Sequence, residues 1–260
     1  MSTLSSISIQ LIRDLLKQLE APSALDQEEV VHQARVLTKR LRAAWHLAQP
    51  ICQKKQAQQA RCELRSLSAL LAPSRDRSVQ TALATNLLQL HPDRSATSPN
   101  LSSLFPETTN PSPLSLACIT GPLVSQIAAW ENVHFGKQER KVLRYRCRLS
   151  LKTAKDLTRQ SLKIDDAEQW HSWRKAIKRL RYQREFLALI YPRELGTYDL
   201  RLRRLGTRLG DHNDLAIFSA QLHSAALKTP DLNRLKKPIA IEERKIKSNC
   251  RRLGRRLFGK

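Results

Sequence analysis

The sequence predicts an all-α fold, and three observations lead to that prediction. Apolar residues recur at three- and four-residue spacing over 4–20, 27–49, 53–71 and 137–162, which is the period of an amphipathic helix. Strand-like runs of alternating β-branched and aromatic residues are almost absent, and no Asn-Gly or Asp-Gly hairpin turn occurs. A basic helical pattern is also present twice in the chain.

The segment 4–20 is expected to be the first helix of the mature protein. It alternates polar and apolar residues and lacks a basic stretch before an apolar core, so it does not resemble a signal peptide. Because this segment does not resemble an export signal, we expect a cytoplasmic protein.

The segments 27–49 and 53–71 are predicted to be the next two helices, because each carries its apolar residues on one face.

Length and composition exclude several classes of protein. The chain has 260 residues, with 46 Lys and Arg against 23 Asp and Glu, and a formal net charge of +23. Seven glycines and 41% hydrophobic residues exclude collagen-like and low-complexity chains, and no run approaches the roughly 18 apolar residues of a membrane span. So large a positive excess causes self-repulsion that an anionic partner would relieve.

The five cysteines are odd in number, scattered and never arranged as Cys-x-x-Cys. This pattern is typical of free thiols in a reducing compartment. It also argues against a zinc site, and the histidines form no ligand-type spacing that would supply one. We expect neither a metal nor a cofactor.

A proline-rich segment divides the chain. Six of the 12 prolines lie within 91–122, among Ser, Thr and Asn, a composition that favours an extended linker. We expect one domain over 1–260 made of two helical halves, 1–90 and 123–260, joined by a linker at 91–122.

The two halves share a sequence pattern. Residues 31–45 align without gaps with residues 170–184, and in both copies a His is followed by Arg, Lys, Arg, Leu and Arg at +3, +7, +8, +9 and +10. Leucine-rich segments follow both copies, and they lead to Arg75-Asp76 in the first half and Asn213-Asp214 in the second. We interpret the chain as an internal repeat, with Asp76 and Asp214 as helix N-caps.

Each copy forms a helix with one basic and one apolar face. At about 100° per residue, the histidine and the basic stripe residues of the first copy fall within about 80° of one another on one side of the helix. The basic side carries His32, Arg35, Lys39 and Arg42 in the first copy, with Arg40 off the stripe, and His171, Arg174, Lys178 and Arg181 in the second, with Arg179 equivalent to Arg40. The apolar side carries Ala34, Leu37, Leu41, Ala44 and Ala48, and Trp173, Ala176, Leu180 and Leu187.

The basic faces are predicted to bind an anion. A solvated helix face usually interleaves acids with bases, yet no Asp or Glu occurs within 32–50 or 171–184. Like charges one turn apart repel by a few tenths of a kcal/mol per pair. Since the same repulsion is present in both halves, we expect it to be relieved by a bound polyanion.

Two further groups of cations are candidates for the same surface. The helix predicted over 137–162 carries a third basic stripe, and the helix over 53–71 carries a weaker one. The residues assigned to the site from these stripes are Lys137, Lys141, Arg144, Arg148, Arg61 and Arg65.

Several assignments leave two alternatives open. His32 and His171 either donate ring N–H groups to the anion or bond a neighbouring helix. Tyr182 lies near the basic stripe and either contacts the ligand or packs. Trp45, Trp170 and Trp173 fall on or beside the apolar faces and are expected in the core.

The doubled His-x-x-Arg-x-x-x-Lys-Arg-Leu-Arg helix resembles the CHAD domain, the conserved-histidine α-helical domain. The similarity extends from about residue 4 to 251, and Leu209 to Asp214 is similar to the signature of the second half. The resemblance implies two four-helix bundles related by a pseudo-twofold axis, with a basic cavity or surface that binds inorganic polyphosphate. It also implies a binding module without chemistry, found on polyphosphate granules or beside polyphosphate-metabolising enzymes.

The residues themselves fit a polyphosphate binder. A chain of phosphates offers charge but no bases, so it needs clustered Arg and Lys donors. Single-strand nucleic-acid binders add aromatic stacking platforms, and aromatic residues make up only 5% of this chain. No P-loop, Gly-x-Ser-x-Gly or His-Glu-x-x-His occurs. Non-specific RNA or DNA binding is the alternative function.

Overall fold

The computed structural model describes residues 3–20, 27–72, 80–87, 117–192, 197–224 and 230–259, and these contain helices and no strand. The all-α prediction is confirmed. The labelled helices are α1 (Leu4–Glu20), α2 (Gln27–Ala48), α3 (Lys54–Leu70), α6 (Ala117–Glu131), the short 3-10 helix η1 (Gly136–Gln138), α7 (Glu139–Ser161), α8 (Ala167–Ile190), α9 (Thr197–Ser224) and α10 (Pro230–Phe258). Residues 80–87 are also helical.

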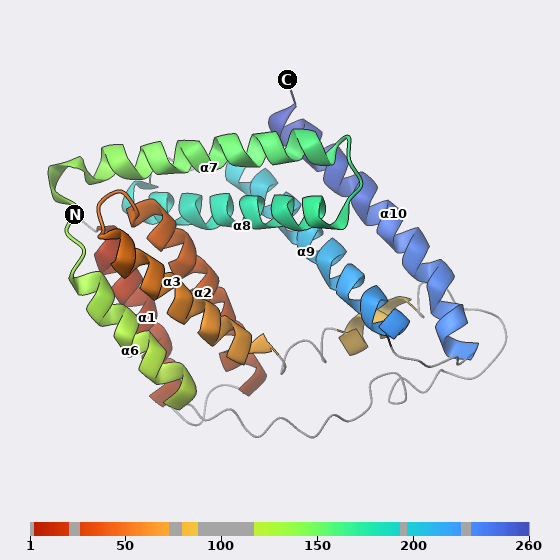
Figure 1. Ribbon diagram of the computed structural model, residues 1–260, viewed down its shortest axis with the longest axis horizontal. Coiled ribbons are helices and arrows are strands. Elements are labelled where there is room, and N and C mark those ends of the chain that lie inside the picture. The colour runs from red at the N-terminus through yellow and green to blue at the C-terminus, as the bar shows by residue number, and fades with distance from the viewer. Residues whose placement is uncertain are drawn as a thin grey trace.

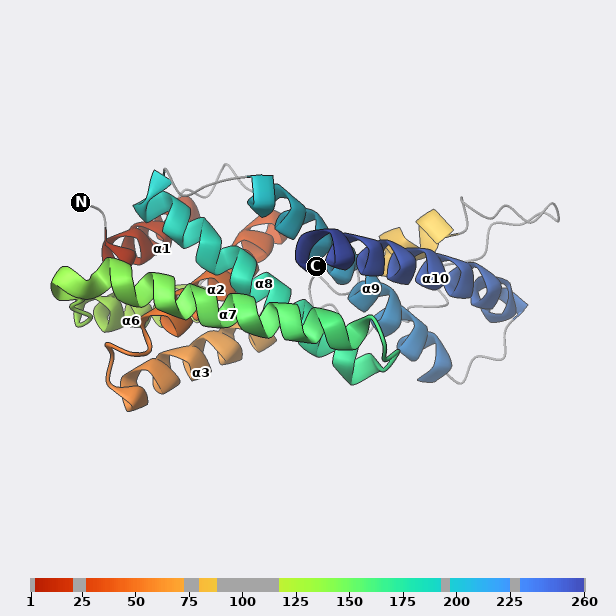
Figure 2. The same ribbon diagram turned by 90° about the horizontal axis from the view of Figure 1, so that it is seen from above.

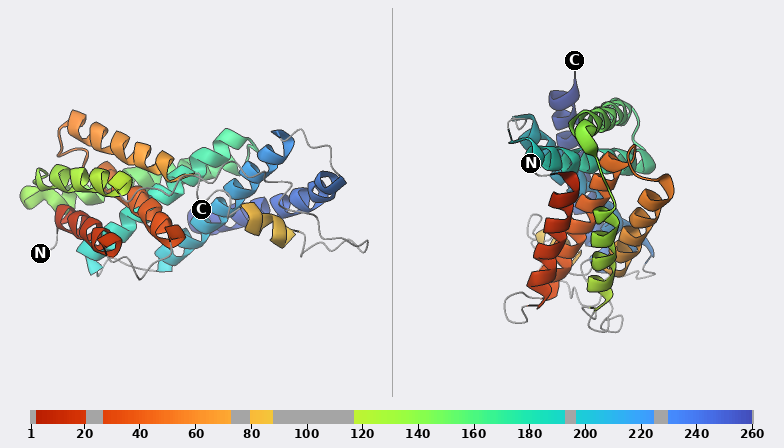
Figure 3. Two further views of the ribbon diagram at one scale, coloured as in Figure 1. Left: turned by 90° about the horizontal axis from the view of Figure 1, so that it is seen from below. Right: turned by 90° about the vertical axis from the view of Figure 1, so that its left-hand side faces the viewer.

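The helices pack in two groups (Figure 1). In the first group α1 packs on α2 and α6, and α3 packs on α2 and α6, so that the four helices lie side by side (Figure 3, right). In the second group α7 packs on α8 and α10, and α9 packs on α8 and α10. That these groups are two bundles related by a pseudo-twofold axis remains a prediction.

The α7–α8 hairpin joins the two groups. Helix α7 runs along the molecule from the first group to α10 (Figure 2), and both α7 and α8 contact α2. Helix α8 also contacts α1. The two helices with the repeated sequence, α2 and α8, therefore pack directly against each other.

Helix α6 begins inside the range expected to be a linker. It starts at Ala117 and contains Pro122, so the expected boundary between linker and second half runs through a helix. Ile119, Leu123 and Trp130 of α6 are each no more than 1% exposed. Their burial outweighs the turn-like composition and compensates for the backbone hydrogen bond that a proline inside a helix removes. Residues 91–116 lie outside the described part of the chain.

The predicted core tryptophans are buried. Trp45 of α2 stacks on Trp130 of α6 with ring centroids 4.1 Å apart, and its indole N–H donates to Gln126 Oε1 at 2.9 Å. Trp173 of α8 donates to Thr158 Oγ1 of α7 at 2.8 Å. Trp170 is 2% exposed. The prediction that Trp45, Trp170 and Trp173 pack in the core is confirmed.

The expected N-cap at Asp214 is wrong. Helix α9 continues from Thr197 to Ser224 and takes Asp214 into its middle, because Leu205, Leu209 and Leu215 remain buried at helical spacing across this stretch. Asp166 does cap a helix, because its carboxylate accepts from the Gln169 backbone N–H at 2.9 Å at the start of α8. Asp76 lies outside the described residues.

All five cysteines, Cys52, Cys62, Cys118, Cys147 and Cys250, are free thiols, as their spacing predicted. No helix within the described ranges has the length and apolar character needed to cross a membrane.

Gly254 lets α10 approach α7 and α8 closely. A Cβ added there would lie 2.9 Å from both Thr158 Cγ2 and Trp173 Cζ2. We predict that Gly254→Ala lowers the free energy of unfolding by about 1–3 kcal/mol through overpacking, measured by urea denaturation.

Gly206 provides the matched control. It also lies within a helix, but a Cβ there would meet Ile177 Cγ2 at an ordinary 3.7 Å. Gly206→Ala should be neutral or stabilising by up to about 1 kcal/mol through helix propensity. Equal destabilisation by both substitutions would contradict the packing described for α10.

Candidate functional site

A cavity of about 220 Å³ lies between α2 and α8. Nine described residues line it, and none of the nine is an acid. They are Lys39, Arg42, Ala43 and His46 of α2, and Arg174, Lys175, Lys178, Arg179 and Tyr182 of α8. Six cationic side chains thus surround one space that is smaller than the roughly 300–1,000 Å³ of a drug-sized site.

The helical spacing of each sequence copy delivers these side chains. Lys39, Arg42 and His46 follow one another at three and four residues on α2, and Arg174, Lys178 and Tyr182 do so at four on α8. The opposite faces are buried as the sequence predicted, with Ala34, Leu37, Leu41, Ala44 and Ala48 of α2 and Trp173, Ala176, Leu180 and Leu187 of α8 each at most 5% exposed. Because the apolar faces fix both helices in the core, the cations have little freedom to separate.

Lys178 shows the consequence of this crowding. Burial, together with the charges of Arg174 and Lys39, lowers its pKa to about 7, although Asp214 acts in the opposite direction. Its ammonium lies against α9, where a Cβ added to Gly210 would be 3.7 Å from Nζ. Near neutral pH this lysine is therefore part amine and part ammonium.

The pKa values of three other cavity residues, His46, Arg42 and Arg179, are also lowered. Burial and the charges of Arg179, Arg61, Arg146 and Arg42 lower the pKa of His46 to about 3, so this imidazole is neutral. Burial also lowers the pKa of Arg42 and of Arg179, and neighbouring guanidinium groups add to the effect. An anion in the cavity would favour the charged forms and reverse these shifts.

Helices α3 and α7 extend the positive region beyond the cavity lining. The charges of Arg61 and Arg65 on α3 act on Arg42. From α7, Arg146 donates to the His46 carbonyl oxygen at 3.1 Å and to Gln49 Oε1 at 2.7 Å. Arg146 therefore fixes the C-terminal turn of α2 and brings its own charge close to Arg179.

The structure places only part of the predicted site in this cavity. Of the candidate residues, Lys39, Arg42, Arg174, Lys178, Arg179 and Tyr182 line it. The candidates outside the lining are His32, Arg35, Arg40, Arg61, Arg65, Lys137, Lys141, Arg144, Arg148, His171 and Arg181. Tyr182 packs, since it is 5% exposed, and it also contributes to the cavity wall; its contact with a ligand remains a prediction.

Three of the repeated cations make contacts within the fold. Arg35 donates to the Leu71 carbonyl oxygen at 2.6 Å and so satisfies the end of α3. The Arg40 guanidinium lies 5.9 Å from the centroid of the Phe186 ring. Arg181 pairs with Glu185 at 3.0 Å and lies 4.5 Å from the centroid of the Tyr182 ring. These contacts explain why the repeat keeps cations that do not line the cavity.

The remaining candidates lie farther out. His32 and His171 are exposed, as are Lys137, Lys141 and Arg148. Lys137 belongs to η1 rather than to α7. The face of α7 that meets α2 carries Arg146, on the other side of the helix from the predicted stripe. A ligand role for these residues remains a prediction.

Sequence reasoning missed His46, Lys175 and Arg146. His46 is seven residues after Lys39, two helical turns along the same face, so its spacing was a usable signal. Lys175 lies one turn after His171. Nothing in the local pattern marked Arg146, because its role depends on how α7 packs against α2.

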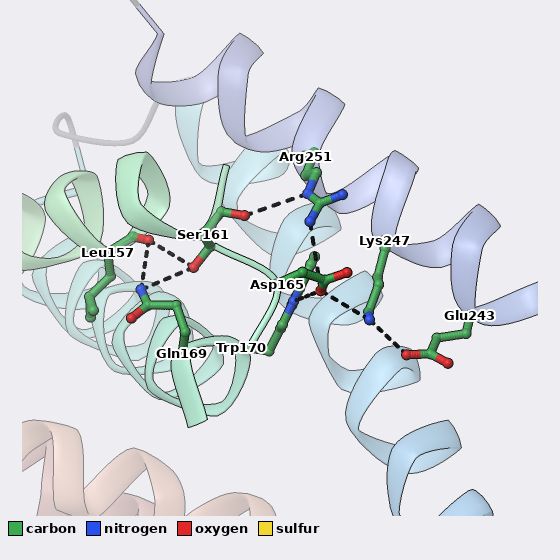
Figure 4. Close-up of polar contacts among 8 residues, drawn as sticks. All are labelled: Leu157, Ser161, Asp165, Gln169, Trp170, Glu243, Lys247 and Arg251. Atoms are coloured by element: carbon green, nitrogen blue, oxygen red, sulfur yellow. Dashed lines mark hydrogen bonds and ion pairs between the residues drawn. The ribbon is translucent and has the colours of Figure 1, made fainter. Parts of the chain in front are cut away.

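A polar network at the N-terminal end of α8 holds the start of this helix in place (Figure 4). Asp165, in the turn before α8, accepts from the Trp170 indole N–H at 2.7 Å and pairs with Lys247 of α10 at 3.0 Å. Lys247 also pairs with Glu243 at 2.7 Å. Burial raises the pKa of Asp165, but the hydrogen bonds from Lys247 and Trp170 outweigh it and leave the pKa lowered.

The same turn is held from α7. Gln169 Nε2 donates to the Leu157 carbonyl oxygen at 3.3 Å and to Ser161 Oγ at 3.2 Å. Arg251 of α10 reaches the Ser161 carbonyl oxygen at 3.5 Å. Contacts from both α7 and α10 thus hold the start of α8, and with it the register of the cavity residues further along the helix.

Within the part of the chain that the structure describes, no group of three or more His, Cys, Asp or Glu side chains is placed to hold a metal ion. The lining of the cavity supplies guanidinium and lysine amino groups.

The fold and the cavity define an all-α protein with a cation-lined space between two helices of similar sequence. A family model for the CHAD domain matches residues 10–223, a range that includes every residue of the cavity. The chain belongs to the CHAD domain family. No curated protein and no solved structure matches the chain at a significant level.

The pKa of Lys178 predicts a dependence of stability on pH. Its folded value of about 7 lies below the ordinary value of about 10.4, so the unfolded chain binds more protons between these values and the contribution of Lys178 to stability rises with pH. Lys178→Met should be more stable than wild type at pH 6, on the order of a few kcal/mol, and the difference should shrink toward pH 10.

Urea denaturation of both proteins at pH 6, 8 and 10 measures this difference. Comparing the two proteins at each pH cancels the titrations that they share. A stability difference that stays constant across this range would mean that burial and the neighbouring cations do not lower the pKa of Lys178.

Proposed function

We propose that the protein binds inorganic polyphosphate, without chemistry of its own, through the cavity between α2 and α8. The observation that carries this proposal is the cavity lining, in which six cationic side chains and no carboxylate face one space. Polyphosphate carries a negative charge on each internal unit, so several units can be neutralised by one such cluster.

The types of side chain suit this ligand. Arg42, Arg174 and Arg179 supply planar, bidentate donors, while Lys39, Lys175 and Lys178 act as point charges. A space of about 220 Å³ holds a short part of a chain, and the remaining units would continue past Arg61 and Arg65 on α3. Binding would also relieve the repulsion among the cations that, after burial, lowers the pKa of Lys178.

Non-specific nucleic-acid binding is the alternative. The same cations would hold phosphodiesters, but a single-strand binder also needs exposed aromatic faces on which bases stack. Tyr182 is the one aromatic side chain in the cavity lining, and it is 5% exposed. This favours polyphosphate. Association with granules and with polyphosphate-metabolising enzymes remains an expectation from the family.

Charge removal at the cavity tests the proposal. The triple variant Lys39→Met, Lys175→Met and Arg179→Met removes three charges from the lining and keeps apolar stems. We expect affinity for long-chain polyphosphate to fall by at least about tenfold and the salt dependence to flatten by a slope of roughly two to three, by analogy with counterion release. Isothermal titration calorimetry over a salt series gives both quantities.

The control removes the same number of charges from an exposed face of α10, as Arg252→Met, Arg255→Met and Arg256→Met. Its affinity should change far less than that of the cavity variant. Equal losses would contradict a cavity site. If single-stranded RNA at equal charge concentration displaces polyphosphate in physiological salt, the nucleic-acid alternative stands. Shortening of the polyphosphate during incubation would refute binding without catalysis.

A further inference from the structure

Lys178 places an amine beside side chains that can hold a phosphate group. Its side chain is half-buried and lines the cavity between α2 and α8. Its Nζ lies against Gly210, a position of α9 with no side chain of its own to cover the amine. Arg174 and Arg179 line the same cavity and offer donors for a phosphate group beside this amine.

The charges that face Lys178 come from three helices. Lys39 of α2 and Arg174 and Arg181 of α8 disfavour its ammonium form, while Asp214 of α9 favours it. Asp211, also on α9, is close enough for Lys178 to lower its pKa, although burial leaves that pKa raised overall. Burial and the cations prevail at Lys178, so the neutral amine is abundant at neutral pH.

We propose that Lys178 is a covalent modification site, whose amine is acylated by small acyl phosphates that the cavity cations hold by their phosphate group. An acyl phosphate matches the site because its anionic end suits Arg174 and Arg179 and its carbonyl carbon is the electrophile that an amine attacks. A small donor also fits a space of about 220 Å³.

The reaction is a balanced acyl transfer. The amine lone pair attacks the carbonyl carbon, the new C–N bond forms, and the bond from that carbon to the bridging oxygen breaks. The electron pair stays on this oxygen, which leaves as inorganic phosphate and takes the proton that the amine loses. The product is an uncharged amide at Lys178, so acylation removes one cation from the cavity.

Acetyl phosphate, with peptide mass spectrometry of the full chain, tests this inference. A lysine of pKa about 7 carries on the order of several hundred times more free amine at pH 7.5 than a lysine of ordinary pKa. Intrinsic nucleophilicity falls with pKa, so we expect acetylation of Lys178 to be at least about tenfold faster than that of the exposed Lys55. The rate at Lys178 should level off near pH 8, while rates at ordinary exposed lysines keep rising.

Two further measurements distinguish capture of the donor's phosphate group by the cavity from the reactivity of the Lys178 amine alone. Inorganic phosphate should protect Lys178 but not Lys55, and the preference for Lys178 should be larger with acetyl phosphate than with the uncharged donor p-nitrophenyl acetate. Arg179→Met should slow acetylation of Lys178 severalfold, whereas Arg256→Met on an exposed face of α10 should not. Wild-type protein alone supplies the first measurement if the Arg179 variant fails to fold.

The inference is overturned if Lys178 reacts no faster than Lys55 and Lys175, or if phosphate gives it no protection. It uses the same cavity as the proposed function but not the same ligand, so the two fail separately. Selective acetylation of Lys178 that long-chain polyphosphate does not block would support this inference and contradict the proposed function.

Discussion

Like charges are held together in this protein by the apolar packing of the helices that carry them. Helices α2 and α8 bury one face each in the core, and their basic faces meet around a single cavity. Repulsion among the cations would push the helices apart, but doing so would expose the core residues, at roughly 25 cal/mol for each Å² of apolar surface. Apolar packing thus holds the cations close together despite their repulsion, and a bound anion would reduce that repulsion.

The rest of the molecule keeps this arrangement in register. Asp165 and its partners fix the start of α8, Arg146 ties α7 to the end of α2, and Arg35 satisfies the last turn of α3. Trp45 and Trp173 anchor the two helices through indole hydrogen bonds inside the core. Cations therefore have two roles in this chain. Some stabilise the fold through contacts with carbonyl oxygens and acids, and others line the cavity.

The sequence predicted features that depend on one helix at a time. The all-α class, the apolar and basic faces of the repeated helix and the burial of Trp45, Trp170 and Trp173 all follow from helical period. Features that depend on packing between helices were missed. Arg35 and Lys39 lie on the same predicted basic face of α2. The packing of α3 against α2 places the Leu71 carbonyl oxygen beside Arg35, whereas Lys39 lines the cavity. Likewise, the proline-rich composition up to Pro122 indicated a linker, although Ile119, Leu123 and Trp130 of α6 recur at helical spacing and are buried.

Proton uptake on binding tests the central claim most directly. At pH 8 Lys178 is mostly neutral, and a polyanion beside it would restore its charge, so the account predicts uptake approaching about one proton for each cavity filled. Calorimetry of polyphosphate binding in two buffers of different ionisation enthalpy measures this number. Uptake that disappears in Lys178→Met would place the polyanion among the crowded cations. Tight binding without proton uptake, or equal uptake in the variant, would contradict the account.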